Sequence, residues 1–135
     1  MADRHVSGVL DTSVVIDLPV IDEARLPMRA TITSVTLAEL SQGPHLAATP
    51  IERAVRLERL QVVEAVFQAA LPFDATAARR YGALVALVLN AGRTVRPRRL
   101  DLMIAATAAV HALPLFTRNV GDFEGLQGVL EIVGV

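Results

Sequence analysis

Short apolar runs alternate with longer amphipathic stretches along the whole chain. The pairs Val9-Leu10, Leu115-Phe116 and Ile132-Val133 place apolar side chains on both parities, which is typical of strands covered on two faces. Turn-forming or capping residues follow most of these runs. We therefore predict five short strands, the third being the weakest, at residues 6–10, 31–33, 68–73, 113–117 and 129–133.

Helix signals occupy the intervals between these runs. Thr49 and Glu52 have capping-box spacing, and a proline stands between them at the first helical position. Asp74 can cap an alanine-rich helix that continues to Asn90. Further helices are expected from Ser34 to the stop signal at residues 43–44 and from Asp101 to about residue 111.

Strands that alternate with helices need crossover connections, which make a sheet mostly parallel and place helices on both of its faces. The sequence therefore predicts a single domain, residues 1–135, with a three-layer α/β/α fold around a central, mostly parallel sheet of about five strands. Ligands of such sheets bind beyond the carboxyl ends of the strands. The residues that follow each strand are therefore the candidates for chemistry.

Four carboxylates stand at such positions. Asp11 directly follows the first strand, Glu39 lies in the helix after the second, Asp101 opens an apolar helix, and Asp122 comes shortly after the fourth strand. Clustered carboxylates repel one another unless a cation neutralises them, and Mg²⁺ and Mn²⁺ prefer oxygen ligands. Taken singly, each aspartate has a simpler interpretation, as a helix cap or a turn former. The four together predict a metal site.

Composition removes several other chemistries. All 13 basic residues among the 135 are arginine, and there is no lysine and no cysteine. Lysine-dependent phosphate loops, Schiff-base chemistry and thiolate zinc sites are therefore excluded. The net charge of −1 argues against blanket electrostatic binding of nucleic acid. No stretch reaches about 18 uninterrupted apolar residues, so we expect no membrane span and a cytoplasmic location.

Four segments carry a family resemblance, which covers nearly the whole chain. Together they resemble the PIN-domain ribonucleases, and more narrowly the VapC toxins of bacterial type II toxin–antitoxin systems. The segments are VLDTSVVI at residues 9–16, ITSVTLAEL at 32–40, RLDLMIAATA at 99–108 and LFTRNVGDF at 115–123.

The resemblance implies a ribonuclease that needs Mg²⁺ or Mn²⁺, cleaves RNA and so inhibits translation and growth. It implies neutralisation by a cognate VapB-like antitoxin, and a homodimer that forms a toxin–antitoxin hetero-oligomer. It also implies site residues. The implied metal-binding set is Asp11, Glu39, Asp101 and Asp122. Thr117 and Asn119 match the polar positions beside that set, where they would orient a carboxylate or water.

Arginines crowd the loop before Asp101, and one follows the fourth strand. They form either a solvated loop or a phosphate clamp, because arginine forks match phosphate geometry. The candidate RNA-binding residues are Arg93, Arg96, Arg98, Arg99 and Arg118.

Other classes fit less well. A haloacid-dehalogenase-type phosphatase needs a second aspartate where Ser13 stands, a receiver domain needs a lysine, and a Rossmann module needs a glycine-rich first turn. The remaining alternative is a catalytically silent PIN-like module that binds RNA or protein. Surplus apolar residues between positions 81 and 89 favour a partner surface.

Overall fold

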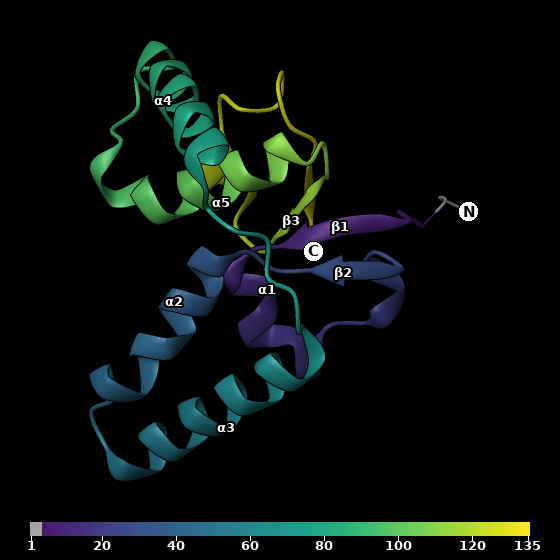
Figure 1. Cartoon of the computed structure of the whole chain (residues 1–135), viewed down its shortest axis with the longest axis vertical. Helices are drawn as coiled ribbons and strands as arrows, with labels where there is room; N and C mark the ends of the chain where they lie inside the picture. Colours follow the sequence, from purple (N-terminus) through teal and green to yellow (C-terminus); the bar gives the residue numbers. More distant parts are fainter. Residues whose placement is uncertain (1–3) are drawn as a thin grey trace.

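The computed structural model describes residues 4–135, and the first three residues of the expected domain lie outside the described part. A four-stranded sheet runs through its centre, and every neighbouring pair of strands is parallel (Figure 1). The order across the sheet is β2-β1-β3-β4, so the first strand of the chain is an inner strand. The strands are β1 (Ser7–Leu10), β2 (Arg29–Thr31), β3 (Leu115–Thr117) and β4 (Ile132–Gly134).

One of the five expected strands did not form. Within residues 68–73, only Leu71 pairs with the sheet region, through a single parallel bridge to Thr33. The Leu71 amide donates to the Ile32 carbonyl at 2.9 Å, and the Ser34 amide donates to the Leu71 carbonyl at 2.8 Å. The predicted count of about five strands is therefore too high by one in the described chain.

The helices follow the predicted pattern with small shifts. Thr49 and Asp74 cap their helices as predicted, but Thr33, rather than Ser34, caps the helix after β2. The last helix begins at Arg99, two residues before Asp101. Single 3-10 turns connect several elements. The α-helices are α1 (Thr12–Asp17), α2 (Ser34–Gln42), α3 (Pro50–Val66), α4 (Ala75–Asn90) and α5 (Arg99–Val110).

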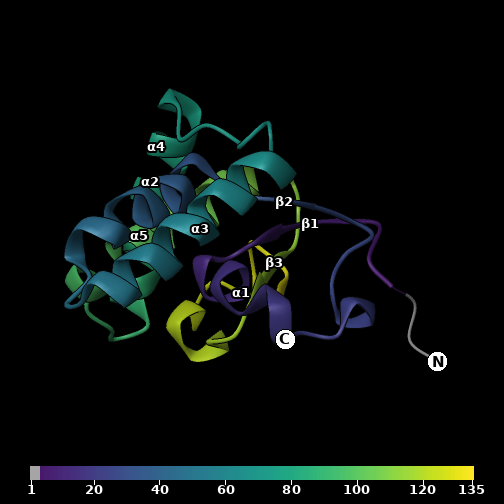
Figure 2. The ribbon, with the colours of Figure 1, turned by 90° about the horizontal axis from the view of Figure 1, so that it is seen from below.

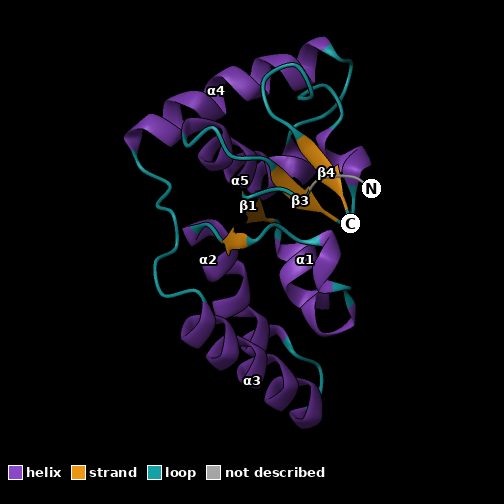
Figure 3. Cartoon of the chain, turned by 90° about the vertical axis from the view of Figure 1, so that its right-hand side faces the viewer, coloured by secondary structure: helices purple, strands orange, loops and turns teal. Residues whose placement is uncertain are grey.

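Helices cover both faces of the sheet, which confirms the predicted three layers. Val9 and Leu115 belong to a core shared with α4 and α5, whereas their strand neighbours Leu10 and Phe116 belong to a core shared with α1, α2 and α3. Figures 1 and 3 show α4 and α5 on one side of the sheet and α1 and α3 on the other. Within residues 4–135, no helix is long and apolar enough to cross a membrane.

The carboxyl ends of the strands lead toward the amino ends of the helices. β1 leads into α1 through Asp11, and β2 leads into α2 after two residues. The view from below shows α1 beside β3 and close to the ends of the strands (Figure 2). Because all strands run in the same direction, the residues that follow them lie at one edge of the sheet.

Candidate active site

Asp11 is the most buried of the four carboxylates, at 4% exposed, and it caps α1. Its Oδ1 accepts from the Thr12 amide at 2.9 Å, and its Oδ2 accepts from Ser13 Oγ at 2.9 Å and Thr117 Oγ1 at 2.8 Å. Burial raises the pKa of the Asp11 carboxyl, the three hydrogen bonds oppose that rise, and the charge of Asp122 adds to it. The Asp11 side chain is therefore held in one orientation on the strand end.

Glu39 lies in α2 and faces Asp11 across the start of α1. Thr12 Oγ1 donates to Glu39 Oε1 at 2.8 Å and lies 2.9 Å from Thr36 Oγ1. Burial raises the pKa of Glu39, the Thr12 hydrogen bond lowers it, and the charge of Asp11 raises it. Two threonines thus fix the carboxylate that α2 contributes.

Asp101 stands in the first turn of α5. Burial, followed by the charges of Asp11, Asp122 and Glu39, raises its pKa from 3.8 to about 7, and the nearby Arg98 opposes that rise. Since three other carboxylates act on Asp101, the fold brings all four predicted acidic residues into one electrostatic neighbourhood. The charge of each makes ionisation of the others less favourable.

Asp122 lies in the 3-10 turn η5 (Val120–Phe123) that follows β3. Its amide donates to the Asn119 carbonyl at 3.0 Å. Thr117 Oγ1 accepts from the Asn119 amide at 3.0 Å while it donates to Asp11 Oδ2. Thr117 therefore connects the strand-end carboxylate to the loop that leads to Asp122, and Asn119 takes part through its backbone.

The donor set suits a hard divalent cation in its chemistry. It consists of four carboxylates with no sulfur or imidazole ligand, and their mutual repulsion is what a bound cation would relieve. Within residues 4–135, however, no three acidic or histidine side chains form a ready-made metal-binding group. The carboxylates thus share a neighbourhood without yet converging on one point.

Two of the candidate RNA-binding arginines line a pocket together with the carboxylates. Arg96 and Arg99 border a cavity of about 340 Å³ with Glu39 and Asp101. Both arginines are exposed. Their guanidinium groups are therefore available to an anionic ligand beside the acidic residues.

Two more candidate arginines make contacts with the protein itself. Arg93 donates to the Gly121 carbonyl and lies 3.6 Å from Glu124 Oε2. Arg98 donates from Nη1 to the Thr94 carbonyl at 2.8 Å, and its buried Nε has no hydrogen-bond partner in the described chain. The Arg93 contacts link the loop between α4 and α5 to the turn after β3, whereas the Arg98 hydrogen bond lies within the loop.

Arg118, the fifth candidate, directly follows β3. Its Nε is 3.3 Å from Asp17 Oδ2, and its Nη1 donates to the Val135 carbonyl at 3.4 Å. Its amide donates to Ser13 Oγ at 3.2 Å. The side chain thus contacts α1 and the C-terminal strand segment.

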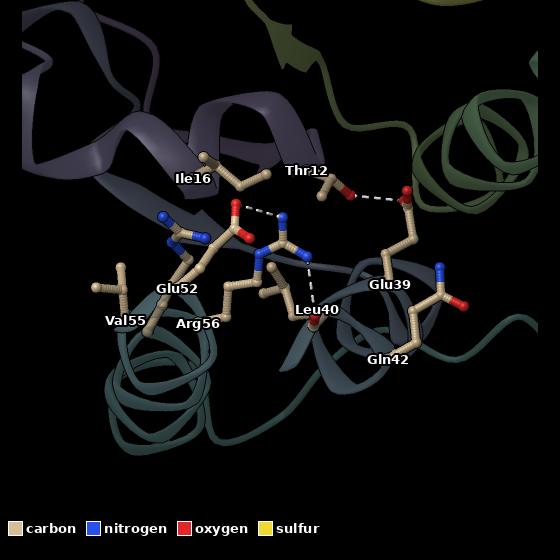
Figure 4. A pocket seen from close by; sticks show the side chains of 10 residues that line it. Thr12, Ile16, Glu39, Leu40, Gln42, Glu52, Val55 and Arg56 are labelled. Carbon is tan, nitrogen blue, oxygen red and sulfur yellow. Dashed lines mark hydrogen bonds and ion pairs between the residues drawn. The ribbon is translucent and has the colours of Figure 1, made fainter. Parts of the chain in front are cut away.

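A second cavity, of about 500 Å³, opens beside Glu39 between α1, α2 and α3 (Figure 4). Arg56 lies in it and donates to Glu52 Oε1 at 3.2 Å and to the Gly43 carbonyl at 2.9 Å. Figure 4 shows the Thr12–Glu39 hydrogen bond at the opposite end of the cavity. Glu39 therefore lines both this cavity and the acidic site. Within the cavity, the Arg56 guanidinium offsets the negative charge of Glu52.

The sequence reasoning missed three hydroxyl side chains of this site. Thr12, Ser13 and Thr36 hydrogen-bond to the carboxylates or to one another. The sequence did contain a signal for two of them. Thr12 and Ser13 directly follow Asp11 in the sequence, at the start of the helix that follows the first strand.

Comparison with known proteins gives the same class. Residues 8–126 match the PIN domain family. Ribonuclease VapC5 of Mycobacterium tuberculosis is 42% identical over 135 residues, which cover 98% of this chain and 96% of that protein. VapC ribonuclease Y4jK of Sinorhizobium fredii is 33% identical over 129 residues, which cover 86% of this chain and 89% of that protein.

Comparison with solved structures also finds proteins with the same fold. The crystal structure of VapBC-5 from Mycobacterium tuberculosis, a member of the VapBC family of toxin–antitoxin systems, matches with a TM-score of 0.84 at 45% identity, over 96% of this chain and 99% of that one. FitAcB from Neisseria gonorrhoeae matches with a TM-score of 0.72 at 27% identity, over 93% and 96%. The chain belongs to the PIN domain family. Within that family it is of the VapC type, which confirms the resemblance read from its sequence.

Proposed function

We propose that this protein is a ribonuclease toxin that hydrolyses phosphodiester bonds of RNA with the help of Mg²⁺ or Mn²⁺. The observation that carries the proposal is the gathering of Asp11, Glu39, Asp101 and Asp122 from four separate segments at one edge of the sheet. Buried carboxylates that raise one another's pKa are costly to a fold. The names of the VapC relatives support the same activity.

The four carboxylates would hold the cation. Once bound, it would activate a water molecule and stabilise the charge that develops on the departing oxygen. The chain's own hydroxyls prepare the ligands for this role. Ser13 and Thr117 orient the Asp11 carboxylate, and Thr12 orients that of Glu39. Asn119 supports the geometry through its hydrogen bond to Thr117.

RNA would bind across the acidic edge with its phosphates on nearby arginines. Arg96 and Arg99 are the best placed, since they line the same cavity as Glu39 and Asp101. Guanidinium groups match phosphate geometry and offset the negative charge of the carboxylates. Arg98 lies beside Asp101, whereas Arg118 contacts Asp17 and lies further from this cavity.

A partner protein would regulate the ribonuclease activity. VapBC-5 is a member of the VapBC family of toxin–antitoxin systems, and another matching structure is a toxin–antitoxin complex from Klebsiella pneumoniae. We infer that a VapB-like antitoxin neutralises this protein, and that a homodimer joins the antitoxin in a hetero-oligomer. Uninhibited, the ribonuclease would block translation and growth.

The test combines cleavage in cells with cleavage by the purified protein. New 5′ ends are mapped across the transcriptome after induction of the wild type, Asp11→Asn and the matched control Asp22→Asn. Asp22 is an exposed aspartate at the start of a 3-10 turn, outside the acidic site. We expect new 5′ ends and growth arrest with the wild type and Asp22→Asn only.

The purified proteins are then incubated with RNAs that contain the mapped sites, in EDTA and after addition of Mg²⁺ or Mn²⁺. Cleavage by the wild type should require the added cation, and Asp11→Asn should remain folded and inactive. Full activity of Asp11→Asn would refute the assignment of the site. Absence of cleavage with every RNA, together with retained RNA or protein binding, would favour the catalytically silent module.

A further inference from the structure

Of the four carboxylates, Asp122 is the one whose backbone has the least regular secondary structure around it. Asp11 caps α1, Glu39 lies within α2 and Asp101 lies in the first turn of α5, whereas Asp122 lies in the single 3-10 turn η5. Such turns have poorer hydrogen-bond geometry than an α-helix. A contact from outside the turn can therefore help to hold Asp122 in place.

Arg93 supplies such a contact from the end of α4. Gly92, at φ +77°, reverses the chain after the helix, and the Arg93 amide donates to the Val88 carbonyl at 3.1 Å. The Arg93 side chain is 21% exposed and donates from Nη1 to the carbonyl of Gly121, the residue before Asp122. The same nitrogen lies 3.6 Å from Glu124 Oε2, two residues after Asp122.

A second, independent contact fixes the same two segments. Gly125 has φ +97°, and a Cβ at this position would lie 3.2 Å from Ala91 Cβ and 3.7 Å from the Leu87 carbonyl oxygen. The chain after η5 therefore packs closely against the last turn of α4, where only glycine fits without strain. This backbone contact sets the distance that the Arg93 side chain spans.

We propose that Arg93 is a positioning residue for Asp122, and that it sets the affinity of the site for its divalent cation rather than binding RNA. Its guanidinium contacts the residues on both sides of Asp122, so it fixes the turn without touching the carboxylate. This inference rests on the proposed function, because it assigns Asp122 to the cation. It differs from the sequence-based prediction that Arg93 contacts phosphate.

The chemistry of the contact explains why an arginine stands there. A planar guanidinium can donate to a carbonyl and face a carboxylate at once, with a fixed angle between its donors. Groups that orient metal ligands in this way typically change metal affinity by about 10- to 100-fold when they are removed. Lysine, with a single flexible ammonium, would restore the charge without that geometry.

The experiment measures Mn²⁺ binding by the loss of the free-ion electron paramagnetic resonance signal, with no RNA present. Wild type, Arg93→Lys, Arg93→Met and the control Arg80→Met are compared, since Arg80 is an exposed arginine on the same helix, α4. Thermal unfolding in EDTA shows that each variant is folded. We expect Mn²⁺ affinity to fall about tenfold in Arg93→Met, less in Arg93→Lys, and to stay unchanged in Arg80→Met.

A double variant separates positioning from general destabilisation. If Arg93 acts through Asp122, then adding Arg93→Met to Asp122→Asn causes no further loss of Mn²⁺ affinity. The amides of Asp122 and Glu124 donate to the carbonyls of Asn119 and Gly121 around η5, so their hydrogen exchange should accelerate in Arg93→Met and not in Arg80→Met.

The outcomes are distinct. Unchanged Mn²⁺ affinity in a folded Arg93→Met overturns the proposal, and so does the same further loss in the Asp122→Asn background. Unchanged hydrogen exchange in Arg93→Met shows that Arg93 does not fix the turn, and also overturns it. If the wild type itself binds no Mn²⁺, the proposed function fails first, and the exchange data still report whether Arg93 holds η5.

Discussion

Replacing Asp101 with asparagine should stabilise the cation-free protein at alkaline pH. Burial is the largest cause of the raised pKa of Asp101, and the charges of three other carboxylates add to it, so that the pKa reaches about 7. At pH 8 the wild-type carboxyl must be ionised in spite of these neighbours. Asparagine has nearly the same shape and no charge, so it removes the repulsion while leaving the packing unchanged.

The magnitude follows from the shift of the pKa. A rise from 3.8 to about 7 corresponds to about 4 kcal/mol at about 1.36 kcal/mol per pH unit. Solvent screens a carboxyl that is only partly buried, so we halve this figure and expect about 2 kcal/mol. For a domain of this size, that gain raises the Tm by about 8 °C.

The pH dependence has a definite sign. Between pH 3.8 and about 7, the folded protein binds a proton at Asp101 that the unfolded chain has released. The free energy of unfolding of the wild type therefore falls as the pH rises through this window. This contribution is absent from Asp101→Asn. The gap in the free energy of unfolding between the variant and the wild type therefore grows toward pH 8 and disappears below pH 3.8.

Urea unfolding in EDTA, at several values between pH 4 and pH 8, measures this gap directly. Added Mg²⁺ should stabilise the wild type more than the variant at pH 8, because cation and substitution relieve the same repulsion. A variant that is no more stable than the wild type at pH 8 would refute the reasoning. A gap that does not change with pH would do the same.

Two further changes test the packing and the hydrogen bonds of the strand ends. Gly8→Ala should lower the free energy of unfolding by about 1–3 kcal/mol in urea, since its Cβ would overlap the buried ring of Phe116. Gly82→Ala lies in α4, where the new Cβ would meet no other part of the described chain within 4 Å, so this change should instead raise the free energy of unfolding by about 0.5–1 kcal/mol. A loss of similar size in both variants would contradict this explanation. Thr117→Val removes a 2.8 Å hydrogen bond to Asp11 and should slow RNA cleavage at least about tenfold, whereas Thr107→Val, whose buried hydroxyl bonds only its own helix, should leave the rate nearly unchanged. Equal cleavage rates for the two threonine variants would show that the Thr117 hydroxyl does not contribute to RNA cleavage.

The layers of the fold could be predicted because apolar residues of both parities mark strands buried on two faces. The missing strand at residues 68–73 has a physical reason. Pro72 has no amide to donate to a ladder, and the Phe73 amide donates to Ser34 Oγ at 3.0 Å instead. Thr33 likewise caps α2 through its side chain, so it stands outside β2, in which it was predicted to lie.

The shared neighbourhood of the four carboxylates could be predicted because they lie in segments that follow strands or open a helix at the same edge of a parallel sheet. Among the hydroxyls beside them, Thr117 was expected from the family resemblance, whereas the contacts of Thr12 and Thr36 join segments that no local pattern connects. Thr12 contacts Thr36 across 24 residues of sequence, and Thr117 contacts Asp11 across 106. The inward orientation of Arg93 was equally hidden, because its partner loop follows 28 residues later.

The central position of β1 has a kinetic consequence. β1 comes first along the chain, yet it lies between β2 and β3, and the residue that joins Asp11 to the opposite half of the site stands 106 residues further on. Parallel strands that are far apart in the sequence pair slowly, because the chain between them must lose conformational entropy before the strand contacts form. A refolding chain can therefore build the core of α1, α2 and α3 while the acidic site is still open. Cation affinity should return only in the slowest phase of refolding, when β3 docks beside β1.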